Sequence, residues 1–352
     1  MIARLALLAA SLVLLAAGAA LAETWKLDVW EPPFRYEGRP RSLDYQPLDK
    51  AERPWRLCAS YPHLKDSYWL SVNYGMVEQA RQLGIRLEVV EAGGYPNLTR
   101  QRQQIADCVA AGAEALIVGT VSFDGLSDLM VELSQSIPIV AAVNDIADDG
   151  ISAKAGVSWT EMGYAIGRYF ALRHPAGSQP VKLAWFPGPK GAGWVRFVET
   201  GFAEGLKGSA AEIVVTKFGD TGTEIQLILI EEALEEHPEI DYIVGSAVTA
   251  EAAVSVLRAR GLTEEIAVLA DYFTHGVFRG IKRGKILAAP TDSPVMQGRI
   301  AIDQAVRLLE GKLVVRHAGP RIVVIDEESI DGLALEDSLA PAWFNPVFVV
   351  EP

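Results

Sequence analysis

The feature that most constrains the fold of this chain is a regular alternation, beginning after Trp55, of short apolar runs with longer amphipathic stretches. The first four runs are apolar at nearly every position, which is typical of parallel strands that helices cover on both faces. They occupy residues 57–61, 87–90, 115–118 and 137–143. The alternation therefore predicts buried parallel strands joined by helices.

The stretch after the first run predicts an amphipathic helix over residues 68–83. Four apolar residues fall on one stripe at helical spacing, namely Val72, Met76, Ala80 and Leu83. Ser67 or Asp66 can cap the first turn of this helix, and Gly84 can end it.

The alternation then restarts, which indicates a second lobe. Strand-like runs at residues 181–186, 213–218, 242–244 and 266–270 alternate with helical stretches at 194–206, 224–236 and 250–260. Two sets of similar size predict an α/β protein of two doubly wound, Rossmann-like lobes. A further strand at 286–289 and a helix at 295–309 indicate that the chain returns to the first lobe and crosses again, so that several linkers form a hinge.

These patterns lead to one expected division of the chain. Residues 23–54 lack a clear period and are expected to form an extended N-terminal arm. The first lobe is expected to comprise residues 55–158 with 273–291, and the second lobe 159–271 with 293–320. The C-terminal segment, residues 321–352, ends in a stretch rich in proline and aromatic residues that is expected to lie on the surface.

Residues 1–22 have the layout of a secretory signal peptide. Arg4 supplies a positive charge, residues 5–21 are almost all apolar, and Ala20-Leu21-Ala22 is a small-x-small cleavage site. The alternative is a retained membrane anchor, but the apolar run is near the lower limit for crossing a bilayer and no basic cluster follows it. We therefore expect a cleaved segment and an exported, soluble mature protein.

Charge and cysteine content restrict the partners and the compartment. A formal net charge of -13 disfavours nucleic acid and anionic membranes as partners. The two cysteines, Cys58 and Cys108, can form one disulfide in an oxidising compartment. A pair of buried free thiols is the alternative, because separation along the chain does not decide between them.

No pattern in the sequence specifies a catalytic centre, a cofactor or a metal site. The chain has no GxSxG motif, and the glycine-rich residues 188–193 lack both the GK[ST] end of a P-loop and the GxGxxG spacing of a dinucleotide site. The five histidines, at positions 63, 174, 237, 275 and 317, show no metal-ligand spacing, so surface or capping roles are expected for them.

Aromatic residues, by contrast, recur where predicted strands end and helices begin: Tyr68, Trp69, Tyr95, Trp159 and Tyr272. The ligand crevice of an open parallel sheet lies outside the carboxyl ends of its strands, so these rings are expected to face a cleft between the lobes. Such rings suit a compact ligand with a methylated, positively polarised nitrogen, and Asp66 can add a negative charge beside it. Ordinary packing is the alternative for any one ring, and a sugar also stacks on such rings.

Several segments resemble the type I periplasmic binding protein superfamily, and within it the TorT group of trimethylamine N-oxide sensors. The superfamily resemblance rests on residues 270–272, 280–289 and 296–299. The TorT resemblance rests on Leu64 to Met76, which is the most specific match, and on residues 91–95, 112–115, 187–189 and 240–241, together with Trp159 and residues 162–164.

This resemblance implies a periplasmic protein that binds trimethylamine N-oxide and contacts the sensor domain of the membrane histidine kinase TorS. The ligand residues it implies are Asp66, Tyr68, Trp69, Tyr95, Trp159 and Tyr272, with Trp194 and Asp292 as additional candidates. The family's two cysteines match Cys58 and Cys108. Asp271 is more typical of sugar-binding relatives, and a transport receptor for a sugar or a methylated amine is the alternative function.

Overall fold

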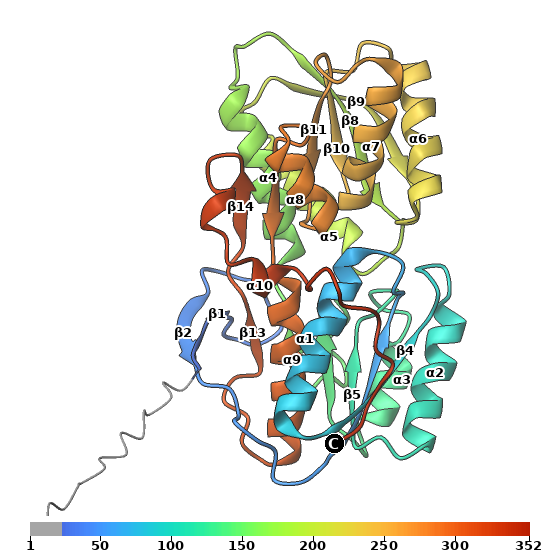
Figure 1. Ribbon diagram of the computed structural model, residues 1–352, viewed down its shortest axis with the longest axis vertical. Coiled ribbons are helices and arrows are strands. Elements are labelled where there is room, and N and C mark those ends of the chain that lie inside the picture. Colours follow the sequence, from blue (N-terminus) through green and yellow to red (C-terminus); the bar gives the residue numbers. More distant parts are fainter. Residues whose placement is uncertain (1–22) are drawn as a thin grey trace, which may run out of the picture.

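The computed structural model describes residues 23–352, which form two α/β lobes, one below the other in Figure 1. The expected signal peptide, residues 1–22, lies outside the described residues. No helix within residues 23–352 is both long enough and apolar enough to span a bilayer. The two lobes confirm the predicted fold class.

The first lobe is built on a nine-stranded sheet of order β15-β4-β3-β5-β6-β7-β13-β1-β2. Its strands are β1 (Trp25–Val29), β2 (Arg41–Tyr45), β3 (Arg56–Tyr61), β4 (Arg86–Glu91), β5 (Ala115–Val118), β6 (Ile139–Ala142), β7 (Ala153–Ala155), β13 (His317–Gly319) and β15 (Val349–Val350). The strands from β4 to β13 in this order pair in parallel, and β15, β1 and β2 add antiparallel edges.

Helices cover both faces of the first sheet. The helices of this lobe are α1 (Ser67–Leu83), α2 (Leu98–Ala110), α3 (Ser127–Leu133) and α9 (Pro294–Leu309). The predicted stripe of α1 is fully buried, Asp66 caps the helix, and Gly84 ends it in the left-handed conformation. A separate apolar cluster lies under α2 and α3, where Cys58 of β3 and Cys108 of α2 form a disulfide, which confirms that pairing.

The second lobe is built on a six-stranded sheet of order β14-β12-β11-β10-β8-β9. Its strands are β8 (Val181–Gly188), β9 (Ala211–Phe218), β10 (Tyr242–Gly245), β11 (Ala267–Ala270), β12 (Ala288–Thr291) and β14 (Val323–Asp326). Its helices are α4 (Trp159–Arg173), α5 (Val195–Gly205), α6 (Thr223–Glu236), α7 (Ala247–Arg260) and α8 (His275–Lys282). All pairings are parallel except that of β12 with β14.

The structure corrects the expected division between the lobes. The sequence pattern places residues 273–291 in the first lobe, but α8 and β12 belong to the second, where β12 pairs in parallel with β11. The pattern places residues 293–320 in the second lobe, but α9 packs on α1 and on β5 to β7, and β13 pairs with β7. Apolar periodicity identifies a βα unit without identifying the sheet it joins, which depends on strand pairing.

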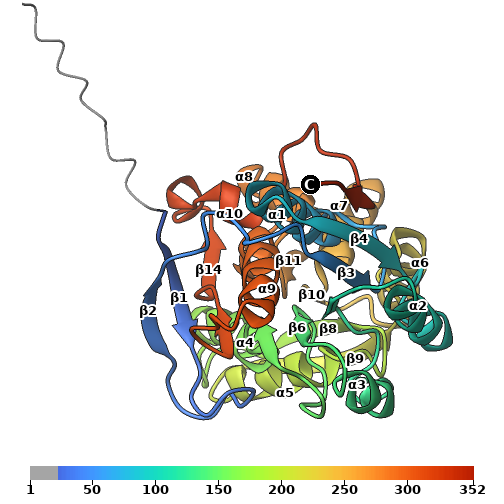
Figure 2. The same ribbon diagram turned by 90° about the horizontal axis from the view of Figure 1, so that it is seen from below.

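Both terminal segments contain strands that the sequence did not predict, although the stretch after residue 340 lies largely on the surface, as expected. The predicted arm contains the β1–β2 hairpin, whose residues Trp25, Leu27 and Val29 are buried in alternation. In the C-terminal segment, β14 joins the second sheet, and a short 3-10 helix η1 (Ile330–Gly332) and α10 (Leu335–Ser338) follow it. The chain then returns to the first lobe, where β15 pairs with β4 at the edge opposite the hairpin (Figure 2).

Glycines allow two helix pairs to pack closely enough to position the site. A Cβ on Gly75 of α1 would lie 2.0 Å from the carbonyl oxygen of Val295 in α9. Likewise, a Cβ on Gly201 of α5 would lie 1.8 Å from the carbonyl oxygen of Thr160 in α4. Because these pairs meet at their backbones, the residues at the start of α1 lie beside those that precede α9, and the starts of α4 and α5 lie together.

Candidate functional site

A small cavity lies between the two lobes, and side chains from both lobes line it. The first lobe contributes Asp66, Tyr68, Trp69, Tyr95 and Asn144, and the second contributes Trp159, Trp194, Thr221 and Tyr272. All six predicted ligand residues and the additional candidate Trp194 are therefore brought together, as expected from their places at strand ends and helix starts.

The start of α1 supplies three of these residues. The side chain of Asp66 accepts a hydrogen bond from the backbone N–H of Trp69 at 3.0 Å, which caps the helix and fixes the carboxylate at the cavity. Trp69 is 2% exposed, and its ring rests on the backbone of Gly119 just after β5. Because no side chain stands at position 119, the edge of the indole can lie against the end of the sheet.

The starts of α4 and α5 supply two tryptophans whose ring centroids are 5.2 Å apart, Trp159 and Trp194. The indole N–H of Trp159 donates to the backbone oxygen of Val143 in the first lobe at 3.0 Å. Val143 has a φ of 67°, which is strained for a β-branched residue, and the N–H of Asn144 bonds back to Ala142 at 2.8 Å. This tight turn aims the Val143 oxygen at Trp159 and Asn144 at the cavity.

Tyr272 follows β11 and closes the cavity from the second lobe. Its ring lies 5.2 Å from Tyr68, 6.3 Å from Trp159 and 6.0 Å from Trp194, each in an edge-to-face arrangement. Tyr95 completes the set, with its ring 6.4 Å from that of Trp194. The rings thus form one continuous aromatic wall that extends across both lobes.

Asp292, the other additional candidate, does not line the cavity and instead lies behind Tyr68. The Tyr68 hydroxyl donates to Asp292 Oδ2 at 2.5 Å, and the Gln297 side chain donates to the same oxygen at 2.6 Å. Burial raises the pKa of Asp292, and these two hydrogen bonds oppose the rise. Asp292 lies in the linker between β12 and α9, so it connects the aromatic wall to a segment that crosses between the lobes.

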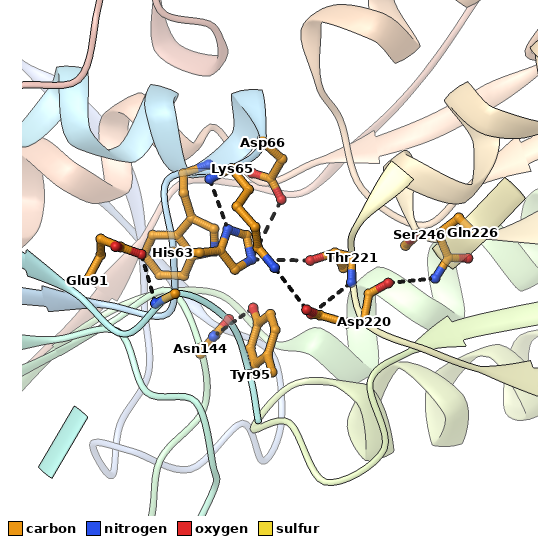
Figure 3. A network of polar contacts seen from close by, with 12 residues as sticks. His63, Lys65, Asp66, Glu91, Tyr95, Asn144, Asp220, Thr221, Gln226 and Ser246 are labelled. Carbon is orange, nitrogen blue, oxygen red and sulfur yellow. Dashed lines mark hydrogen bonds and ion pairs between the residues drawn. The ribbon is translucent and has the colours of Figure 1, made fainter. Parts of the chain in front are cut away.

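Polar contacts beside the cavity connect the lobes directly (Figure 3). Lys65 Nζ lies 2.9 Å from Asp220 Oδ2, and His63 Nε2 lies 3.2 Å from Thr221 Oγ1. The backbone N–H of Lys65 donates to Nδ1 of His63 at 3.4 Å, so the neutral ring carries its proton on Nε2 and donates it to Thr221. Burial lowers the pKa of His63, which keeps the ring neutral at neutral pH.

The space between the rings is small and its surroundings are acidic. It offers about 10 Å³ to the centre of a water-sized sphere, which is room for about one water molecule. Asp66 borders it, and no Lys or Arg lines it. The arrangement suits a compact onium group, and a ligand larger than water requires the rings to move apart.

Sequence reasoning missed three residues of the site, namely Asn144, Thr221 and His63. Asn144 lies two residues after the end of β6 and Thr221 three residues after the end of β9, so a polar residue shortly after a predicted strand was the available signal. The expectation of surface or capping roles was wrong for His63 and His317, which are both fully buried. Across residues 23–352, no group of acidic, histidine or cysteine side chains could hold a metal ion.

A family model described as "Periplasmic binding proteins and sugar binding domain of LacI family" matches residues 54–336. The chain belongs to the periplasmic binding protein family. The family confirms the prediction that this chain is a binding protein rather than an enzyme.

This binding protein is similar to the periplasmic protein TorT of Escherichia coli strain K12, with 42% identity over 299 residues, which are 85% of this chain and 86% of TorT. The TorT resemblance inferred from the sequence is thereby confirmed.

Two solved structures extend the similarity. One contains TorT in complex with the TorS sensor domain in the presence of TMAO, with a TM-score of 0.77, 41% identity and coverage of 84% of this chain and 99% of the other. The other is an ABC transporter solute binding protein from Bradyrhizobium sp. BTAi1 with bound bis-tris, with a TM-score of 0.79, 49% identity and coverage of 92% and 98%.

Proposed function

We propose that this protein binds trimethylamine N-oxide between its lobes in the periplasm and signals its presence to the periplasmic sensor domain of the histidine kinase TorS. The observation that carries this proposal is the convergence of aromatic rings from both lobes on one small, acidic cavity. Similarity to TorT and to the TorS–TorT complexes supports the same ligand and the same partner.

The chemistry of the ligand fits the cage. Trimethylamine N-oxide presents three methyl groups around a positively charged nitrogen, and ring faces attract such a group by about 0.5–1 kcal/mol at exposed sites and about 2 kcal/mol when water is excluded. The carboxylate of Asp66 adds a negative charge at the cavity. The N-oxide oxygen is a strong acceptor, and the Tyr95 hydroxyl at the cavity wall can donate to it.

The signal follows from closure of the lobes. Trp159, Trp194 and Tyr272 meet the rings of the first lobe only when the lobes are together, so a ligand that contacts both sets favours the closed form. The Lys65–Asp220 ion pair also forms only in that state, and as a partly exposed pair it contributes about 0.2–1 kcal/mol. A ligand therefore changes the relative placement of the two lobe surfaces, which is the signal that the kinase sensor domain would detect.

A second candidate function is that of a transport receptor that delivers a methylated amine or a sugar to a membrane permease. The similarity to the Bradyrhizobium solute binding protein favours it, since that relative is described as part of an ABC transporter. Both functions use the same cavity and differ in the partner that the closed lobes meet.

Calorimetric titration of the mature protein with trimethylamine N-oxide, trimethylamine, betaine and ribose tests the ligand. We expect the N-oxide to bind, and heat from ribose alone would contradict the proposal. We expect Trp69→Ala and Trp159→Ala each to weaken binding by about 1–3 kcal/mol through lost cation–π attraction and packing. Unchanged affinity in both variants would show that these aromatic rings do not bind the ligand.

The partner is tested separately by mixing the liganded protein with a TorS sensor domain and, in parallel, with a permease in detergent. Co-elution with the sensor domain supports signalling. Co-elution with the permease alone assigns the protein to transport while leaving the ligand assignment intact.

A further inference from the structure

The cavity wall contains a buried hydrogen-bond donor that has no acceptor. Nε1 of Trp194 has no partner among residues 23–352, although the side chain is 2% exposed and lines the cavity. A buried N–H group without an acceptor in the protein is uncommon in folded proteins. Such a group at a binding cavity indicates that its acceptor comes from the ligand.

The Trp194 ring is fixed in place by its surroundings. One edge lies against the backbone of Gly188, where a Cβ would stand 2.6 Å from Cη2 of the indole, so the ring cannot retreat in that direction. Trp159 and Tyr272 pack on it at 5.2 Å and 6.0 Å between centroids. The donor is therefore held in a defined position before a ligand arrives, which lowers the entropic cost of using it.

A second donor lies beside it. The Tyr95 hydroxyl accepts a hydrogen bond from Asn144 Nδ2 at 3.2 Å, and the amide of Asn144 also donates to the Thr120 backbone oxygen at 2.8 Å. The proton of the Tyr95 hydroxyl is not used in either bond. Burial raises the pKa of Tyr95, whereas the amide of Asn144 and the nearby indoles of Trp69 and Trp194 act to lower it. The Trp194 N–H thus lies near the Tyr95 hydroxyl but makes no hydrogen bond to it.

We propose that Trp194 donates its indole N–H to the oxygen of the ligand and thereby selects methylated amines that carry an anionic oxygen over simple quaternary ammonium ions. This inference rests on the proposed function and identifies the group that hydrogen-bonds to the ligand oxygen. An N-oxide oxygen has three lone pairs, so it can accept from Trp194 and from Tyr95 together. The methyl groups then face the remaining rings and Asp66.

The test compares two ligands of similar shape, trimethylamine N-oxide and tetramethylammonium chloride, on the full mature protein and its Trp194→Phe variant. Phenylalanine keeps an aromatic ring and removes the N–H. We expect the affinity for the N-oxide to fall about 10-fold to 100-fold, the range for a hydrogen bond to a charged acceptor. We expect the affinity for tetramethylammonium to fall by a clearly smaller factor, which reflects only the lost packing and cation–π attraction that both ligands share.

Trp159→Phe is the matched control, because its indole N–H already donates to Val143 and faces no ligand oxygen. We expect this variant to weaken both ligands by a similar factor. An equal loss for both ligands in Trp194→Phe, or no loss for either, would overturn the role of Trp194.

A second measurement follows the Trp194 indole in the wild-type protein and uses the variant only to assign its signal. In the wild-type protein labelled with ¹⁵N-tryptophan, the indole signal of Trp194 is the one missing from the Trp194→Phe spectrum. We expect the N-oxide to shift this signal downfield and tetramethylammonium not to do so. If the N-oxide binds and the signal stays in place, the inference alone fails; if the wild-type protein binds neither ligand, the proposed function fails with it.

Discussion

Substituting Gly119, which contacts no ligand, is expected to weaken ligand binding through Trp69. A Cβ on Gly119 would lie 2.5 Å from Cη2 and 2.9 Å from Cζ3 of the Trp69 indole, about 0.9 Å closer to Cη2 than the 3.4 Å at which ordinary contact begins. The backbone at Gly119 cannot retreat, because its N–H donates to Ser60 and its carbonyl accepts from Gln101. In Gly119→Ala, the indole must therefore move toward the cavity.

The magnitude follows from how little room the cavity has. It holds about one water, so an indole edge that advances by close to 1 Å competes with any ligand for the same space. Overpacking of this kind costs about 1–3 kcal/mol. The unliganded protein can relieve the overlap by letting the ring enter the cavity, whereas the liganded protein cannot. We therefore expect most of that cost to appear in binding, as a loss of affinity of about 5-fold to 150-fold.

The assay is calorimetric titration with trimethylamine N-oxide, with Gly332→Ala as the control because a Cβ there meets nothing within 4 Å. Combining Gly119→Ala with Trp69→Phe removes the clashing indole atoms, so the double variant should bind more tightly than the two single losses predict together. Wild-type affinity in Gly119→Ala, or purely additive losses in the double variant, would refute the argument that Trp69 is wedged between the sheet and the ligand.

Two further predictions concern stability. Replacing Cys58 and Cys108 by serine removes a disulfide that joins residues 50 positions apart. Urea unfolding under non-reducing conditions should show that the free energy of unfolding falls by about 4 kcal/mol. An unchanged midpoint would contradict this. Burial lowers the pKa of His317 to about 2, and its Nδ1 accepts from the backbone N–H of Phe34 at 3.0 Å. In the unfolded state the His317 imidazole takes up a proton near pH 6.5, whereas in the folded state it stays neutral until about pH 2. The free energy of unfolding should therefore fall by about 1.4 kcal/mol per pH unit as the pH decreases from 6.5 toward 2. His317→Asn keeps an acceptor for Phe34 and should lower this slope between pH 7 and pH 5; an unaltered slope would show that His317 is not its source.

The sequence by itself determined the local elements of this protein. Strand β5 lies where its four apolar residues predict, and α1 is buried along the predicted stripe with Asp66 as its cap. These features depend on interactions within a few residues, which a single segment contains. The six predicted ligand residues reached one cavity for a related reason: each follows a strand or opens a helix, and in a doubly wound sheet all such positions face the same side.

Only the tertiary structure decided which sheet each segment joined and what each polar group met. The β12 and α9 segments have patterns that either lobe could accept, and backbone pairing with β11 and the glycine contact with α1 settle their places. Asp292 became a partner of Tyr68 rather than part of the wall for the same reason. A hydrogen bond or an ion pair between residues more than a hundred positions apart depends on atomic distances that periodicity does not encode, and the lone N–H of Trp194 is visible only once every neighbour is in place.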